Sequence, residues 1–172
     1  NDDDINCVFI LTRHNLHSEY VVKCLKQDKH VFVEKPLALN KKELKSIKNS
    51  LIESRGSLMV GFNRRFSECG KKSKDFFEGR NYPLAINYRI NVGHTDPNHW
   101  SHDIEIGGGR IIGEMCHFVD FCNFLCQSEI IKFDFLKLND SNQTLNYSNT
   151  VTLILKYADG SIANVSYISN GD

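Results

Sequence analysis

A glutamate and a lysine stand directly before a proline, at the end of a short run of β-branched and aromatic residues. The run at residues 30–33 is typical of a buried strand, so Glu34 and Lys35 follow at its carboxyl end. Open α/β sheets bind ligands at that end of their strands. The residue before a proline is disfavoured in helical geometry, so we expect the Lys35 ammonium to project from the sheet edge.

A second candidate lies on an apolar helix expected from about residue 110 to 125. Arg110, Glu114 and His117 recur at helical spacing on it, and Asp120 follows three residues later. Ionisable groups on an otherwise apolar helix need partners or a polar cleft. His117 could act as an acid or base, with Asp120 or Glu114 fixing its tautomer. It could equally be a core histidine that a nearby carboxylate satisfies, and the sequence leaves both interpretations open.

The loop at residues 93–105 contains the only tryptophan, Trp100, together with His99, His102 and Asp103. These side chains could bind a metal, but further ligands at fixed offsets, which zinc sites show, are missing. We therefore predict no metal. The preferred interpretation is a loop at the rim of a site, in which Trp100 and Asp103 contact a substrate.

The first third of the chain has the pattern of a parallel sheet. Apolar runs at residues 7–11, 30–33 and 58–61 predict strands, the first of them covered on both faces, and two amphipathic helices are expected between them. Asn40 and Glu43 form a capping box at the start of the second helix. Strand, helix, strand, helix, strand with short links predicts the parallel, right-handed βαβαβ half of a Rossmann fold. Because no GxGxxG turn occurs in the sequence, we expect that the pyrophosphate-binding unit is missing.

The rest of the chain has a different pattern. A helix is expected at residues 67–78, an alternating strand at 84–92 and three further strands at 130–138, 151–157 and 161–168. The last two are joined through Asp159 and Gly160, a signal for a type I′ hairpin. We predict an α/β protein in two parts: a partial Rossmann domain at residues 1–62, and an α+β domain with a mainly antiparallel, open-faced sheet at residues 63–172. One face of that sheet is expected to pair with another subunit in a homo-oligomer.

Composition excludes several classes of partner. The 21 basic and 21 acidic side chains cancel, and no basic cluster alternates with aromatic residues, so we expect no nucleic acid and no membrane surface as partner. No apolar run approaches the roughly 20 residues that span a bilayer. The six cysteines lack zinc-site spacing and are best interpreted as reduced thiols. A small-molecule ligand and a cytoplasmic location are expected.

Four motifs in order give the chain a family resemblance. Polar loops follow all three strands of the predicted parallel sheet, which brings residues 12–17, 34–36 and 63–65 to one edge. Residues 12–17, 33–38 and 61–66, and the glycines at 107–109 that lead to residues 117–120, resemble the ordered motifs of the Gfo/Idh/MocA oxidoreductases. That family includes glucose–fructose oxidoreductase and inositol dehydrogenase.

The resemblance implies an NAD(P)-dependent dehydrogenase or reductase that acts on a sugar, nucleotide-sugar or cyclitol carbon. It implies that Lys35 hydrogen-bonds the reacting hydroxyl and that His117 accepts its proton, so both would touch the substrate. The residues implied to line the NAD or NADP site are Thr12, His14, His17, Glu34, Lys35, Pro36, Asn63 and Arg64.

Two departures from the family pattern favour other hypotheses. The family often has an aspartate one helical turn before the histidine, where this chain has Gly113, with Glu114 beside it as a possible replacement. Without a GxGxxG turn, the 172-residue chain alone is expected to bind NAD(P) poorly and to be inactive, as the middle of a longer enzyme. A non-catalytic homologue kept for assembly is one alternative. A metal-dependent lyase or hydrolase that uses His99, His102 and Asp103 is another.

Overall fold

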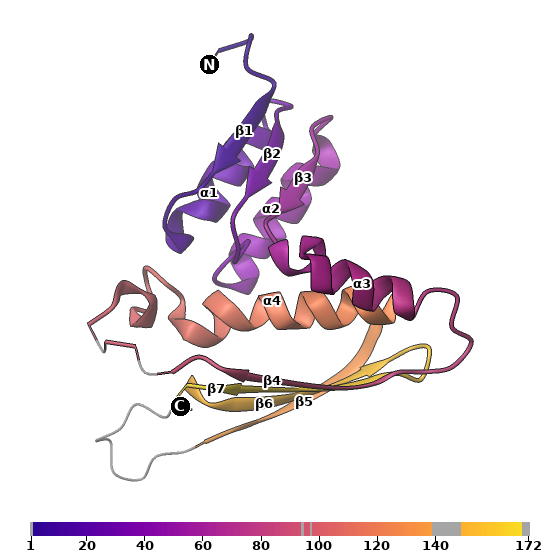
Figure 1. Cartoon of the computed structure of the whole chain (residues 1–172). Coiled ribbons are helices and arrows are strands. Elements are labelled where there is room, and N and C mark those ends of the chain that lie inside the picture. The colour runs from indigo at the N-terminus through magenta and orange to yellow at the C-terminus, as the bar shows by residue number, and fades with distance from the viewer. Residues whose placement is uncertain (1, 94, 97, 139–148, 170–172) are drawn as a thin grey trace. The chain divides into compact units, whose positions relative to one another are not determined.

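A computed structural model describes residues 2–93, 95–96, 98–138 and 149–169 (Figure 1). The chain divides into two compact units. The first combines Asn1–Phe62 with Trp100–Glu114, and the second combines Asn63–His99 with Met115–Asp172. The predicted division at residue 62 into two domains stays a prediction, since residues 100–114 group with the first unit.

The first unit contains a parallel sheet of three strands in the order β1-β2-β3. The strands are β1 (Cys7–Ile10), β2 (His30–Val33) and β3 (Leu58–Val60), and the connecting helices are α1 (His14–Leu25) and α2 (Lys41–Glu53). The expected βαβαβ arrangement is therefore confirmed. Its buried core combines apolar residues of sheet and helices, namely Ile10, Val21, Leu25, Val31, Val33 and Ile47.

Only one face of this sheet is covered within the described residues of the unit. Side chains alternate along a strand, and Ile10 is buried while its neighbour Phe9 is exposed. Phe9 packs against Phe32 with ring centroids 5.3 Å apart, and Met59 on β3 is exposed as well. The expectation that the first strand is covered on both faces is wrong for this part of the chain. A continuous apolar run shows that both faces avoid water, but it does not show which segment covers each.

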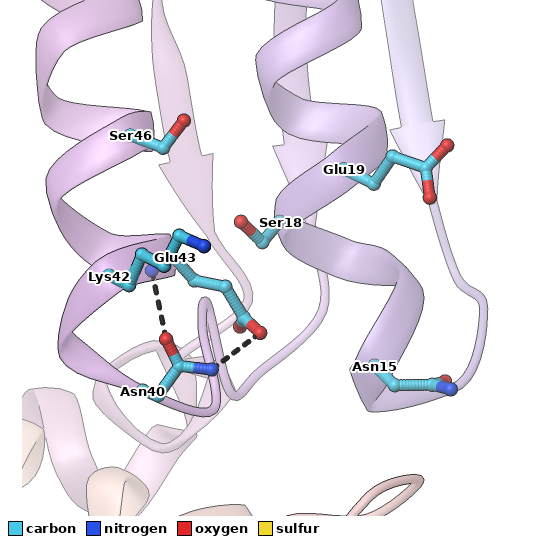
Figure 2. Close-up of a pocket in the computed structure, with 7 residues that line it drawn as sticks. All are labelled: Asn15, Ser18, Glu19, Asn40, Lys42, Glu43 and Ser46. Carbon is cyan, nitrogen blue, oxygen red and sulfur yellow. Dashed lines mark hydrogen bonds between the residues drawn. The ribbon is translucent and has the colours of Figure 1, made fainter.

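The predicted cap of α2 is confirmed. The side-chain oxygen of Asn40 accepts the backbone N–H of Glu43 at 3.0 Å, and the Glu43 carboxylate accepts the backbone N–H of Leu39 at 2.8 Å. Figure 2 shows the Asn40–Glu43 pair beside a pocket lined by polar side chains of α1 and α2. The cap begins α2 directly after the loop that carries Lys35, so it limits how far that loop extends.

The second unit contains a four-stranded sheet in the order β4-β7-β6-β5. Its strands are β4 (Ala85–Asn91), β5 (Ile130–Lys137), β6 (Val151–Tyr157) and β7 (Ile162–Ile168), of which only the β4–β7 pair is parallel. This confirms the mainly antiparallel α+β sheet. The unit also contains the 3₁₀ helix η1 (Asn63–Phe66) and α3 (Glu68–Phe76), while α4 (Gly109–Cys126) begins in the first unit and continues into the second.

Aromatic side chains join α4 to one face of this sheet. Phe118 on α4 meets Tyr88 on β4 at a ring-centroid distance of 5.3 Å and Tyr167 on β7 at 6.1 Å. Deeper in the same layer, the Tyr157 hydroxyl donates to the side-chain oxygen of Asn123 at 2.9 Å. Burial raises the pKa of the nearby Cys122 thiol to about 12, as expected for a core thiol. The buried aromatic layer thus fixes this part of α4 on the sheet.

The hairpin between β6 and β7 exists, but its turn is not of type I′. That type requires positive φ at both central residues, and Gly160 alone has it here, at 93°. The N–H of Gly160 donates to the carbonyl of Tyr157 at 3.1 Å, and the N–H of Tyr157 donates to Ser161 O at 2.9 Å. This is the three-residue loop in which a type I turn precedes a glycine bulge. An Asp-Gly pair is compatible with a two-residue type I′ loop and with this three-residue loop, so the pair alone does not predict the turn type.

Arg80 is expected to stabilise the second unit. Its guanidinium donates to the carbonyls of Tyr82 and Cys126 and to the Asp159 carboxylate. The hydrogen bond from Arg80, together with those from the N–H and hydroxyl of Ser161, lowers the pKa of Asp159 to about 2. Replacing Arg80 by leucine should reduce the protection of β6 and β7 amides in hydrogen exchange by about 2 kcal/mol. Because a carboxylate with a depressed pKa stabilises the fold above its unfolded pKa, the difference from wild type should shrink as pH falls from about 4 to about 2.

The control for this prediction is the exposed ion pair of the first unit. Arg55 donates to Asp28 at 2.9 Å, and its side chain is almost fully exposed, so Arg55→Leu should change the same amides by less than about 0.5 kcal/mol. Equal effects of the two variants on β6 and β7 would show that Arg80 acts only as a surface charge.

Two surfaces of the second sheet remain uncovered in the described residues. Leu136, Ile154 and Ile162 are exposed on the face opposite α4, among polar side chains such as Thr152 and Ser166. On the α4 side, Phe133 lies opposite the buried Leu155 in the strand register but is itself 66% exposed.

Among the described residues, no helix has both the length and the apolar character needed to cross a membrane.

Candidate functional site

The Lys35 side chain is held at the carboxyl end of β2. Its ammonium donates to the carbonyl of Gly113 in α4 at 2.9 Å, within the first unit. Its backbone N–H lies 3.2 Å from the Glu34 carboxylate, and the bond to Pro36 is cis. An ammonium has three donors, so the bond to Gly113 orients the charge and leaves donors for a ligand. The predicted placement of Lys35 at the strand end therefore agrees with the structure.

The Glu34 carboxylate lies over Gly61, which directly follows β3. A Cβ added at Gly61 would stand 3.1 Å from the carboxylate carbon and from one of its oxygens. The absence of a side chain at position 61 thus gives the carboxylate its place at the sheet edge. This contact explains why the third motif of the chain begins with glycine.

His17 joins the loops that follow β1 and β2. Its Nδ1 lies 2.8 Å from the carbonyl oxygen of Pro36, its Nε2 lies 3.0 Å from that of Thr12, and the residue is 0% exposed. These bonds tie the loop that carries Lys35 to the loop after β1. The geometry supports a positioning role for His17, while its predicted contact with a cofactor stays a prediction.

His14, at the start of α1, lies against the short loop before α4. Its Nδ1 is 2.8 Å from the carbonyl oxygen of Gly107, and because a carbonyl only accepts, Nδ1 carries the hydrogen. The ring also meets the Trp100 ring edge-on at 4.8 Å. The Arg13 guanidinium stacks over the same Trp100 ring, 4.8 Å from its centroid. These contacts fix both the tautomer and the orientation of the His14 ring.

Burial lowers the pKa of His14 below its ordinary value. The hydrogen bond to Gly107 opposes this shift, the positive charge of Lys35 and the neighbouring His17 ring add to it, and the Glu114 carboxylate opposes it. The lowered pKa favours a neutral ring whose Nε2 is a hydrogen-bond acceptor.

Two positions at the start of α4 also belong to the first unit. A Cβ added at Gly113 would stand 3.1 Å from Cε1 of His14, so the His14 ring occupies the space beside this glycine. The Glu114 carboxylate lies 3.4 Å from Nε of the buried Arg110. Its predicted help to His117 therefore competes with an ion pair on its own helix, and the catalytic role of Glu114 stays a prediction.

Three further predicted residues, His117, Asn63 and Arg64, belong to the second unit. His117 is half-buried in α4, and Asn63 and Arg64 are exposed in η1. The guanidinium of Arg64 lies over the Phe118 ring, 4.5 Å from its centroid. Asp120 forms a two-bond ion pair with Arg65, in which Nε donates to Oδ2 at 2.9 Å and Nη2 donates to Oδ1. The Asp120 carboxylate could therefore orient His117, as predicted, only in competition with its ion pair to Arg65.

Removing the Asp120 carboxylate should destabilise the second unit. Asp120 is 8% exposed, and without it the Arg65 guanidinium loses its partner in a largely buried setting. Asp120→Ala should lower the unfolding free energy by about 2–3 kcal/mol, measured by hydrogen exchange of α4 amides. Glu68→Gln, which removes an exposed pair with Lys72 on α3, is the control and should cost less than about 1 kcal/mol. Similar losses in both variants would contradict this account of Asp120.

The Trp100 loop is organised by its own backbone. The Asp103 carboxylate accepts the N–H groups of Glu105 at 2.8 Å and Ile106 at 3.1 Å. A substrate that contacts the Asp103 carboxylate, as predicted, would therefore have to compete with these two backbone N–H groups. Across the residues that the structure describes, no group of three or more His, Cys, Asp or Glu side chains could hold a metal ion.

The structure brings together Glu34, Lys35, His14, His17 and Trp100 within the first unit. Sequence analysis missed the carbonyls of Gly107 and Gly113, because backbone acceptors leave no residue-type signal. It also missed Arg65, whose neighbour Arg64 was predicted instead. Two successive arginines in a 3₁₀ helix point in different directions, and their order alone does not identify the one that pairs.

Known proteins resemble this chain in sequence. Residues 1–62 match the family model GFO_IDH_MocA, described as an oxidoreductase family with an NAD-binding Rossmann fold. Myo-inositol 2-dehydrogenase of Thermotoga maritima is 31% identical over 75% of this chain and 38% of its own length. Scyllo-inositol 2-dehydrogenase (NAD(+)) of Bacillus subtilis is 29% identical over 75% of this chain and 37% of its own. The chain thus spans well under two thirds of these relatives.

A solved structure shares the fold. Levoglucosan dehydrogenase in complex with NADH matches 99% of this chain and 49% of its own, with a TM-score of 0.87 and 23% sequence identity. The match covers both the parallel and the mixed sheet, so the fold is that of this dehydrogenase. The family model identifies residues 1–62 with the Gfo/Idh/MocA oxidoreductases, and the two inositol dehydrogenases extend the sequence similarity beyond these residues.

Proposed function

We propose that the protein that contains this chain is a dehydrogenase or reductase acting on a hydroxyl-bearing carbon of a sugar, nucleotide sugar or cyclitol. When bound, NAD or NADP supplies the acceptor or donor of hydride. The observation that carries the proposal is the Lys35 ammonium, held by Gly113 at the carboxyl end of β2. The relatives named for inositol oxidation support the substrate class.

Lys35 would bind the oxygen that reacts. Its positive charge stabilises an alkoxide as it develops, and the hydrogen bond to Gly113 means that little reorganisation is needed during the reaction. His117 would accept the hydroxyl proton. It follows Gly113 by four residues in α4, which is one helical turn, and an imidazole titrates near working pH. Glu114 would assist His117 only if it leaves Arg110.

The residues at this sheet edge fit the nicotinamide end of the cofactor. The strand ends present the backbone of Thr12 and Pro36 and the Glu34 carboxylate over a glycine that leaves room for it. Asn63 and Arg64 would contribute from η1. The pyrophosphate needs a Gly-rich turn, which the sequence of this chain lacks. We therefore propose that the 172-residue chain alone binds NAD(P) weakly and is inactive.

A panel of substrates tests this proposal. The longest natural form of the protein is assayed with NAD and NADP against inositols, levoglucosan and nucleotide sugars, with absorbance at the nicotinamide band as readout. At least one polyol should be oxidised, and its kcat/KM should exceed that of a simple secondary alcohol by about 100-fold or more. Absence of any turnover with a protein that is folded would reject the dehydrogenase proposal.

The alternative is a non-catalytic homologue, and one observation favours it. Gly113 stands where the family often has an aspartate, so a side chain of the usual set is missing from α4. If Lys35 and His117 can both be replaced without any change in the protein's physiological activity, this alternative becomes the better account.

We also propose that the protein is a homo-oligomer in the cytoplasm, joined through the face of the second sheet opposite α4. Leu136, Ile154 and Ile162 are exposed there, and burying them favours association. Ile154→Glu should convert the oligomer to a smaller species in size-exclusion chromatography with light scattering. Lys132→Glu, a charge change on the same face, serves as the control and should leave the mass unchanged. An oligomer that survives I154E would place the interface elsewhere.

A further inference from the structure

The His14 ring presents one hydrogen-bond acceptor beside Lys35. Nδ1 donates to the carbonyl of Gly107, which leaves the Nε2 lone pair without a hydrogen bond to any other residue in the described ranges. The ring and the Lys35 ammonium border the same residue of α4. One contacts the space beside the Gly113 Cα, and the other binds the Gly113 carbonyl. A donor and an acceptor thus both stand against Gly113.

These two groups require different atoms of a ligand. An ammonium only donates, so Lys35 needs an oxygen that accepts, while Nε2 of a neutral ring needs a group that donates. A carboxylate or phosphate oxygen has no hydrogen and would meet the Nε2 lone pair unfavourably. Two hydroxyls on neighbouring carbons satisfy both requirements, since a hydroxyl can accept and donate. Because both groups border Gly113, they match neighbouring hydroxyls better than hydroxyls on opposite sides of a ring.

We propose that Nε2 of His14 accepts a hydrogen bond from a substrate hydroxyl next to the one that Lys35 binds, so that the site selects vicinal diols. This inference rests on the dehydrogenase proposal and adds to it a catalytic-site residue and a narrower substrate class. His14 takes the space that a side chain at position 113 would need. A Cβ at position 113 would stand 3.1 Å from Cε1 of His14, so the ring would have to shift by a few tenths of an ångström.

The charges around His14 support a neutral ring. From its own helix the ring faces His17, from the β2 loop it faces Lys35, and from α4 it faces Glu114, while the Arg13 guanidinium lies over the Trp100 ring that His14 contacts. Burial is the largest influence on the His14 pKa and lowers it, so the acceptor persists to lower pH than in a free histidine. The KM for the diol should accordingly rise only when the pH falls below the ordinary histidine range.

The decisive experiment compares a polyol with its analogue that lacks the neighbouring hydroxyl. In the longest natural form of the protein, the deoxy analogue should react with a kcat/KM about 10- to 100-fold lower, because Nε2 is left without its donor. His14→Leu should lower kcat/KM for the polyol by a similar factor. In H14L the polyol and its analogue should differ by less than about threefold, because the partner of the missing hydroxyl is already gone.

Three further variants separate this role from general damage. His14→Gln keeps an acceptor and should restore part of the discrimination. Gly113→Ala should reduce the discrimination without touching His14 chemically, since its Cβ would push the ring away. His30→Asn, at the amino end of β2 where His30 contacts Ser57, should leave both kcat/KM values unchanged.

A readout independent of turnover is the ¹⁵N resonance of His14 Nε2. In the free protein it should report an unprotonated nitrogen opposite a protonated Nδ1. Adding the polyol in the presence of NADH should shift it as an accepted hydrogen bond forms, and adding the deoxy analogue should not. No shift with a polyol that the enzyme oxidises would overturn the proposal.

The failure of this proposal can be distinguished from the failure of the dehydrogenase proposal. If the wild type oxidises no polyol, the dehydrogenase proposal fails and takes this one with it. If the wild type is active but H14L discriminates against the deoxy analogue as strongly as wild type does, only the role of His14 is rejected. In that case only the reacting hydroxyl is recognised, through its hydrogen bond to Lys35, and His14 does not bind the neighbouring hydroxyl.

Discussion

Replacing Lys35 by methionine is expected to lower kcat/KM for the polyol by about 10³-fold or more. Methionine keeps much of the length of lysine but removes the charge that stabilises the developing alkoxide and the hydrogen bond to Gly113. Because these interactions strengthen in the transition state, kcat should fall at least as much as KM rises. Steady-state kinetics with saturating NAD measures both parameters.

Lys26→Met is the matched control for this prediction. Lys26 is exposed at the end of α1 in the same unit, so its loss should change kcat/KM by less than about twofold. A K35M enzyme that keeps kcat within about threefold of wild type, while binding NADH normally, would remove Lys35 from the reaction.

Replacing His117 by asparagine is expected to lower kcat by about 10²- to 10⁴-fold, the range for loss of a general base. NADH affinity should stay within about threefold of wild type, because the proposed role concerns proton transfer. The result also decides between the two interpretations of this histidine. A core histidine would instead reveal itself through lost stability, seen as reduced hydrogen-exchange protection of the α4 amides.

His30→Asn controls for loss of a histidine as such, since His30 lies at the opposite end of β2. Comparing two substrates whose reacting hydroxyls differ in acidity sharpens the test. Loss of a general base should slow oxidation of the more acidic hydroxyl less, because that hydroxyl gives up its proton more easily. If H117N slows oxidation of both equally and is also destabilised, His117 is structural, and the base must be sought elsewhere.

The sequence predicted the elements well because their signals are local. Apolar runs bounded by turn residues placed β1, β2 and β3, and the Asn40–Glu43 cap located the start of α2. The position of Lys35 at a strand end followed from a single Lys-Pro pair after a strand. Such features depend on a few consecutive residues, and no distant contact is needed to establish them.

Contacts between distant residues could not be predicted in the same way. Lys35 and its acceptor Gly113 are 78 residues apart, and the acceptor is a backbone atom that any residue would offer. The pairing of Asp120 with Arg65 depends on how α4 and η1 approach each other within the second unit. The full burial of His17 was equally hidden, since a histidine in a polar loop resembles one that faces a ligand.

The exposed side of the first sheet shows another limit. Phe9 belongs to the apolar run that was expected to be covered on both faces, yet it is exposed in the described residues of the unit, as is Met59 on β3. The chain spans about half the length of the solved relative it matches. An apolar strand can therefore reflect packing against segments that are not among the described residues. The type of the β6–β7 turn was missed for a different reason, because Asp-Gly is compatible with two loop lengths.

The central claim is that this Rossmann unit serves a nicotinamide cofactor, and fluorescence titration with NADH and NADPH tests it most directly. The 172-residue chain and the longest natural form of the protein are titrated in parallel. We predict that the long form binds one of the two cofactors and that the short chain binds at least about 100-fold more weakly, since it lacks a Gly-rich turn. If neither form binds either cofactor, the family fold serves another purpose here and the account is contradicted.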